Sequence, residues 1–242
     1  MKQAQTADHI VTDGWVRRFH WINVLAILGL AGVGSILFFG KALGLSDDGK
    51  LIIKTTHVLI GYVFVTNLVI RLIWAFIGSE NARWRSILPG GRNFIRSTFF
   101  QIRNLFRAEG HQDENHSPLG RISVALLLLC MITMAVTGLT LAGTDIYYPP
   151  LGNWITEWVA AEGVNPESLV PFRPDLVNEA AWEEMRAFRA PFKKIHEWTF
   201  FVLLALVPLH VAGVILAEIK GPGGVVSSMI NGRRRLLNKT QE

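Results

Sequence analysis

Cysteine is almost absent from this chain of 242 residues, in which Cys130 is the only one. A single thiol makes no internal disulfide and no thiolate metal cluster, and the absence of a C-x-x-C-H motif excludes covalently attached c-type haem. No small-residue cleavage site follows the first apolar block, so we expect that block to remain as a membrane anchor rather than act as a signal peptide. Internal repeats and low-complexity tracts are also absent.

Hydrophobic residues make up 50% of the chain and are gathered into four blocks. Each block is near twenty residues, about the length that crosses roughly 30 Å of hydrocarbon. The blocks therefore predict an all-α fold: an integral membrane four-helix bundle that forms a single domain over residues 1–242. The expected spans are about 19–40, 55–77, 119–142 and 195–219.

The net charge of +5 indicates membrane topology rather than nucleic-acid binding, because of its distribution. Six arginines lie between the second and third blocks and the tail GRRRLLNK is basic, whereas segment 143–194 has eight acids against five bases. Basic loops stay on the cytoplasmic side of a membrane. We therefore expect both termini and the second loop in the cytoplasm, with membrane lipid headgroups as counterions.

Two loops have patterns of their own. Residues 92–107 place arginines on one stripe of a helix and apolar side chains on much of the rest, which is typical of a cytoplasmic helix lying in the membrane interface. A plain basic linker is the alternative. The extracytoplasmic segment 143–194 is too long for a turn, and a helix is expected over about 175–190 with Asp175 as its cap.

Aromatic residues are frequent in this extracytoplasmic segment. They form either an interfacial belt or a docking surface for a partner protein. We favour docking, because a belt alone does not require so long a loop. The residues are Tyr147, Tyr148, Trp154, Trp158 and Trp182.

Four of the seven histidines fall in the spans, where a polar side chain is costly and marks function. The topology places His57 and His196 near the outer boundary, and His20 and His210 near the inner one. His210 follows His196 by fourteen residues, nearly four helical turns, so both imidazoles project from one face about 21 Å apart. One pair at each depth is the arrangement that two bis-histidine haems require.

Small and cationic residues lie in register with these pairs. Gly34 stands at the level of the outer pair, and Gly61 lies one turn beyond the histidine of its own span, so that both leave room for a macrocycle. Arg71, at the depth of the inner pair, and Arg17, at the start of the first span, are candidate cations for haem propionates.

Other polar residues in the spans have simpler interpretations. Asn23 and Asn67 are expected to hydrogen-bond between helices. A haem-free anchor or transporter whose histidines relay protons remains the alternative for the four histidines, although it does not need the glycines.

The four spans together resemble the bacterial dihaem cytochrome b family. That family includes the b-type subunits of nickel–iron hydrogenases and formate dehydrogenases, and the prokaryotic cytochrome b-561 proteins. The stretches that carry the resemblance are WVRRFHWINVLAILGL, THVLIGYVFVTNLVIRLIW, HSPLGRISVALLLLCMITMAVTGL, IHEWTFFVLLALVPLHVAGVI and the tail SSMINGRRR.

The resemblance implies two b-type haems, with iron ligated by the four span histidines in the same pairs, in a protein of the bacterial inner membrane. It also implies electron exchange with the quinone pool at the cytoplasmic side. Asn115 and His116, in ENHSPLG just before the third span, are then candidate catalytic partners of quinone. Their alternative is an ordinary polar cap.

The resulting hypothesis is an electron-transport subunit of a respiratory-chain oxidoreductase. Electrons would pass between an extracytoplasmic redox protein (a hydrogenase, a dehydrogenase or a c-type cytochrome) and quinone. Segment 143–194 is longer than its counterpart in minimal cytochrome b-561 proteins, which favours a partnered role. A stand-alone quinone oxidoreductase that reacts with a small molecule such as superoxide is the alternative, and whether the chain is an enzyme by itself stays open.

Overall fold

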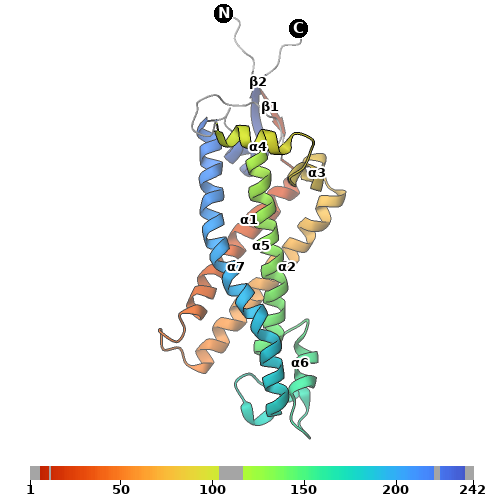
Figure 1. Cartoon of the computed structure of the whole chain (residues 1–242), viewed down its shortest axis with the longest axis vertical. Helices are drawn as coiled ribbons and strands as arrows, with labels where there is room; N and C mark the ends of the chain where they lie inside the picture. Colours follow the sequence, from red (N-terminus) through yellow and green to blue (C-terminus); the bar gives the residue numbers. More distant parts are fainter. Residues whose placement is uncertain (1–5, 11, 104–116, 221–223, 238–242) are drawn as a thin grey trace, which may run out of the picture. The chain divides into compact units, whose positions relative to one another are not determined.

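Four long helices dominate the computed structural model, which describes residues 6–10, 12–103, 117–220 and 224–237 (Figure 1). They are α1 (Gly14–Phe38), α2 (Asp47–Ile77), α5 (Pro118–Ile146) and α7 (Glu179–Lys220). Each is long and apolar enough to cross a membrane, so the predicted four-span helical fold is confirmed. The helices extend beyond the apolar blocks because their polar flanks continue the same backbone hydrogen bonding.

The chain packs as two compact units, each built from a part of every long helix. Unit 1 comprises Met1–Ile22, Leu68–Leu129 and Leu203–Glu242. Unit 2 comprises Asn23–Asn67 and Cys130–Val202. The two members of each predicted histidine pair therefore belong to the same unit.

Unit 1 contains a feature that the sequence patterns did not predict, a small antiparallel sheet. Strand β1 (Thr6–Ile10) pairs with β2 (Arg233–Leu237), with Ile10 opposite Arg233. Beside it, the indole nitrogen of Trp21 donates a hydrogen bond of 2.9 Å to the carbonyl of Met229, at the end of α8 (Val225–Ile230). The segments that flank the first and last long helices are thus tied together within unit 1.

The predicted amphipathic helix over about 92–107 corresponds to α4 (Phe94–Arg103), which begins two residues later than predicted, and residues 104–107 lie outside the described residues. It runs crosswise to the long helices of unit 1 (Figure 1). Its apolar residues Ile95 and Phe99 are 85% and 70% exposed. The helix is held to the first turn of α5 by Gln101, whose side-chain oxygen accepts a hydrogen bond from the backbone amide of Leu119. A membrane-interface position for this helix stays a prediction. The loop before it holds η1 (Glu80–Ala82) and α3 (Trp84–Ile87).

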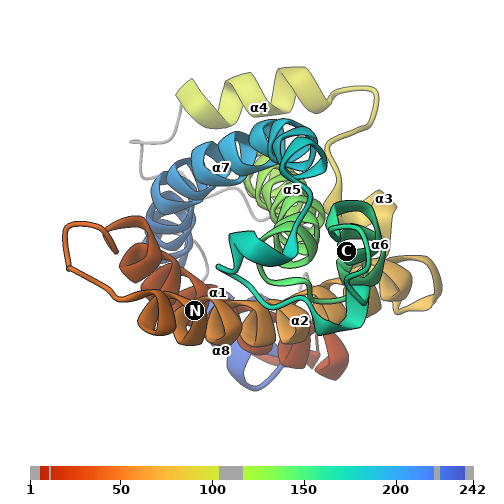
Figure 2. The same ribbon diagram turned by 90° about the horizontal axis from the view of Figure 1, so that it is seen from below.

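In unit 2 the four helical parts contact one another in a ring, in the order α1, α2, α5, α7 (Figure 2). The amide of Asn67 on α2 donates to the side-chain oxygen of Asn23 on α1 at 2.7 Å, which confirms the predicted interhelical bond. Phe38 of α1 and Phe201 of α7 close the opposite side, with ring centres 5.6 Å apart. Contacts of α5 with α2 and α7 complete the ring and are described with the site.

The distribution of burial differs between the spans and the segment between α5 and the fourth span. Large apolar side chains on the spans are exposed, for example Leu25 at 70% and Leu28 at 62%, because these surfaces face lipid. The fully buried apolar side chains of Ile155, Val159 and Met185 instead lie in residues 147–190, here called the α6 segment. This segment contains α6 (Gly152–Val159), η2 (Pro166–Ser168), η3 (Pro174–Leu176) and the first turns of α7. It folds around a hydrophobic core of its own.

The predicted helix start at Asp175 was wrong, since α7 begins at Glu179. Asn178 supplies the cap, because its side-chain oxygen accepts from the backbone amide of Ala181 at 3.0 Å. The carboxylate of Asp175 is instead hydrogen-bonded by the guanidinium of Arg173, which holds the pKa of Asp175 below its usual value. Helix α7 then continues without a break into the fourth span.

Candidate functional site

Two histidines from different helices meet in unit 2. His57 of α2 and His196 of α7 have ring centres 6.3 Å apart, with ring planes inclined at 72°. Two imidazoles bound to opposite sides of one metal ion need ring centres about 6 Å apart, because each metal–nitrogen bond is about 2.0–2.1 Å. The spacing of this unit 2 pair therefore fits one metal ion held between the rings.

Each imidazole of the unit 2 pair lies against a glycine of a neighbouring helix. A Cβ atom at Gly34 would stand 3.2 Å from Cε1 of His57, and one at Gly138 would stand 3.4 Å from Cε1 of His196. A larger side chain at Gly34 would displace the ring. Sequence reasoning placed Gly34 at this level but missed Gly138, because the third span has no histidine from which to count residues.

The ring nitrogens of this pair differ in their partners. Nδ1 of His196 is 2.8 Å from the hydroxyl oxygen of Thr137 on α5. Nδ1 of His57 is buried and has no hydrogen-bond partner. A buried polar atom without a partner costs free energy, so the chain itself leaves the bonding capacity of this ring nitrogen unmet. The ring spacing of 6.3 Å is the observation by which these two residues fit a haem held by one imidazole from each helix.

The second pair lies in unit 1. His20 of α1 and His210 of α7 both belong to this unit. Nδ1 of His210 is 3.3 Å from the hydroxyl oxygen of Ser123 on α5. The ring of His20 packs edge-on against Trp21, with ring centres 5.5 Å apart. The structure thus brings His57 and His196 into ring contact and places His20 and His210 within one unit.

The other candidate residues have contacts of their own. Both terminal nitrogens of Arg71 donate to the carbonyl of Ala82 at 3.3 Å, and Arg17 donates to the carbonyl of Thr12 at 2.7 Å. Beside Gly61 a Cβ atom would meet nothing within 4 Å, so space is open there. A role of these residues at a haem stays a prediction. The two quinone candidates, Asn115 and His116, lie outside the described residues.

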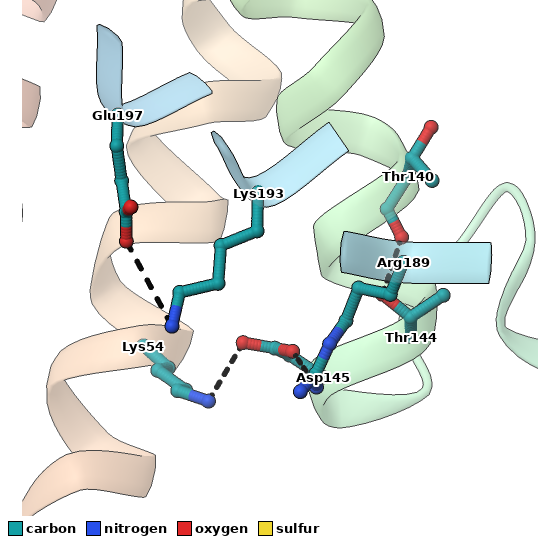
Figure 3. A network of polar contacts seen from close by, with 7 residues as sticks. All are labelled: Lys54, Thr140, Thr144, Asp145, Arg189, Lys193 and Glu197. Atoms are coloured by element: carbon teal, nitrogen blue, oxygen red, sulfur yellow. Dashed lines mark hydrogen bonds and ion pairs between the residues drawn. The ribbon is translucent and has the colours of Figure 1, made fainter. Parts of the chain in front are cut away.

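An ion cluster beyond the unit 2 pair was not anticipated (Figure 3). The carboxylate of Asp145 on α5 accepts from Lys54 of α2 at 2.7 Å and from Arg189 of α7. Lys54 precedes His57 by one helical turn, and Arg189 precedes His196 by two. The cluster therefore joins the two helices that supply the imidazoles to α5. No local pattern predicts it, because Lys54 and Asp145 are 91 residues apart in sequence.

The described residues contain no group of three or more histidine, cysteine, aspartate or glutamate side chains suited to a metal ion. Ligands in twos, within a bundle of membrane-spanning helices, are what an iron porphyrin needs, because the macrocycle supplies the remaining ligands. The chain has no C-x-x-C-H motif, through which a porphyrin is attached by two thioether bonds. Fold and site therefore define a membrane-embedded cytochrome of the b type.

Comparison with known proteins specifies the family. The family model described as prokaryotic cytochrome b561 matches residues 11–232, so the chain belongs to that family. It is a multi-pass protein of the bacterial inner membrane, a b-type cytochrome with a role in electron transfer.

Curated relatives match along nearly the whole chain. The chain is 26% identical to the probable Ni/Fe-hydrogenase 1 B-type cytochrome subunit of Escherichia coli (strain K12), over 96% of this chain and 93% of the relative. It is 26% identical to the probable Ni/Fe-hydrogenase B-type cytochrome subunit of Rhizobium leguminosarum bv. viciae, over 93% and 87%. The corresponding protein of Cupriavidus necator is 24% identical over 93% and 86%. No solved structure matches the chain significantly.

Proposed function

We propose that this chain holds two b-type haems and transfers electrons across the inner membrane between an extracytoplasmic hydrogenase and quinone. The observation that carries the proposal is the unit 2 pair, whose ring spacing of 6.3 Å suits a bis-histidine iron. The second pair, His20 and His210, lies in unit 1, and His210 follows His196 by fourteen residues along α7. Two sites at two depths give a path across the bilayer, which one site alone does not.

The protein's own part is to hold and orient the cofactors. Haem b, when bound, supplies one-electron chemistry at its iron. His57 and His196 would ligate the outer haem, while Gly34 and Gly138 leave their rings in place against the neighbouring helices. The ion cluster of Asp145 holds α2, α5 and α7 together beside this site. Apolar packing around the imidazoles keeps water out and so contributes to the potential.

The proposed hydrogenase partner rests on the curated relatives, which are hydrogenase cytochrome subunits by name. The α6 segment suits a docking role because it is stabilised by its own core and does not depend on a partner to fold. Trp158 and Trp182 pack against that core, but Trp154 is 49% exposed. Trp154, Glu157 and Trp158 line a shallow surface depression. Exposed tryptophan is a typical interface anchor.

The quinone part of the proposal rests on topology and family resemblance. The positive-inside rule places both termini, α4 and the loop before α5 in the cytoplasm. The haem of His20 and His210 is then the inner one and lies on the quinone side. Asn115 and His116 are the proposed quinone partners, with a hydrogen bond or proton transfer to a quinone oxygen as their role.

The test is haem stoichiometry of the purified chain and of single-histidine variants. The wild-type protein should contain two haems with b-type absorption in the reduced state. His57→Ala and His196→Ala should each retain one haem and lose the same one, while His111→Ala, in a polar segment between spans, should retain both. A reduced protein without b-type bands, or full haem content in both variants of the unit 2 pair, would refute the proposal.

A further inference from the structure

Helix α5 has no histidine, yet it contacts both histidines of α7 through a hydroxyl group. Thr137 contacts Nδ1 of His196 at 2.8 Å in unit 2, and Ser123 contacts Nδ1 of His210 at 3.3 Å in unit 1. Thr137 follows Ser123 by fourteen residues, as His210 follows His196. Each contact lies inside one unit. The same contact is thus made twice, one fourteen-residue step apart, as two antiparallel helices in register would make it.

The hydrogen bonds of Thr137 determine which ring nitrogen of His196 holds the proton. The Thr137 hydroxyl donates to the carbonyl of Thr133 at 2.7 Å. A hydroxyl has one proton to donate, so toward the imidazole it acts as acceptor, and Nδ1 of His196 is the donor. Nε2 then has the free lone pair and is the nitrogen available to iron. Thr137 is 3% exposed, so no water replaces this bond easily.

We infer that Thr137 is a positioning residue that fixes the tautomer of His196 and lowers the midpoint potential of the haem that this ligand holds, and that Ser123 accepts in the same way from Nδ1 of His210 when Nε2 of that ring holds iron. This inference rests on the proposed function. An imidazole that donates from Nδ1 to an acceptor is a more basic ligand at its other nitrogen. A more basic ligand stabilises the ferric state. Thr137 has the shorter contact, so its effect is the larger one.

The pattern also makes the two axial ligands of the outer haem unequal. His196 has a hydroxyl acceptor for Nδ1, whereas Nδ1 of His57 has no hydrogen-bond partner in the described structure. At this site the hydrogen bond that tunes the midpoint potential therefore acts only through the α7 ligand, His196. A change at Thr137 acts on one defined ligand.

The experiment is a redox titration of the purified full chain with variants at Thr137. Thr137→Val keeps the shape of the side chain and removes the acceptor, whereas Thr137→Ser keeps the hydroxyl. The matched control is Thr140→Val, since Thr140 is 6% exposed on the same helix and its hydroxyl donates to the carbonyl of Val136. Ser123→Ala tests the other contact.

Thr137→Val should raise the midpoint potential of the outer haem, decreasing its oxidised-to-reduced ratio by up to about tenfold, which equals about 59 mV for one electron. Thr137→Ser and Thr140→Val should leave it unchanged, and Ser123→Ala should shift only the inner haem, by less. Loss of the outer haem from Thr137→Val but not from Thr137→Ser or Thr140→Val also supports the inference, because the hydroxyl then holds the ligand.

An unshifted potential in Thr137→Val, or equal shifts in Thr137→Val and Thr140→Val, would overturn the inference. Neither result would contradict the proposed function. That function is refuted separately if the wild-type chain lacks two haems or if His196→Ala retains both haems. The outer haem is assigned as the one that is absent from His57→Ala.

Discussion

Neutralising Asp145 should destabilise unit 2, because this carboxylate is the shared partner of two cations. In Asp145→Asn the charges of Lys54 and Arg189 would stand beside each other without an acid between them. Their side chains are 25% and 22% exposed, and that of Asp145 is 24% exposed. Water therefore screens the cluster only in part, and the two cations repel each other across α2 and α7.

The magnitude follows from this intermediate exposure. Removing one partner of a buried ion pair costs about 3–5 kcal/mol, whereas an exposed pair contributes about 0.2–1 kcal/mol. For side chains that are about a quarter exposed we expect a loss of about 2 kcal/mol, between these limits. In a chain of this size such a loss lowers the midpoint of thermal unfolding by about 4–8 °C. High salt should decrease the difference, because it screens the repulsion.

The single cysteine makes the assay direct. Cys130 lies within α5 and is partly buried, so the increase of its reaction rate with a fluorogenic thiol dye above the rate in the folded protein reports the opening of unit 2 in detergent solution, without reference to haem. The matched control is Asp175→Asn, since Asp175 also pairs with an arginine but both side chains are more than half exposed. Equal transitions in Asp145→Asn and Asp175→Asn, at low salt, would refute the reasoning that partial burial makes the Asp145 cluster important.

Three further outcomes are expected. Gly34→Leu should displace the imidazole beside it and remove the outer haem, as a pyridine assay of haem content would show. Its control is Gly32→Leu, which should retain two haems per chain because a Cβ atom at Gly32 would meet nothing within 4 Å. Loss of haem from both variants would point to helix packing instead. Trp154→Ala should decrease electron transfer from added hydrogenase at unchanged haem content, and a loss of haem would assign Trp154 to packing. Ile155→Ala should cost about 2–5 kcal/mol in the core of the α6 segment, seen as faster limited proteolysis within residues 160–178; an unchanged cleavage rate would contradict a self-contained core.

Much of the fold was predictable because a membrane imposes a local rule on the sequence. Apolar runs near twenty residues become spanning helices, and a helical period of 3.6 residues places His196 and His210 on one face. The bond between Asn23 and Asn67 was predictable in the same way, since buried polar side chains in a membrane need partners. The start of α7 was less predictable, because Asn178 and Asp175 are both acceptable caps and only the pairing of Asp175 with Arg173 excludes one.

By itself, then, the sequence determined the four spans and the two levels of histidine, because both depend on length and period along a single helix. Only the tertiary structure decided which groups surround the rings. Thr137 and His196 are 59 residues apart, and Ser123 and His210 are 87 apart. Contacts at such separations depend on which faces of two helices meet and at what height, and that is set by packing between helices rather than by any pattern within one of them.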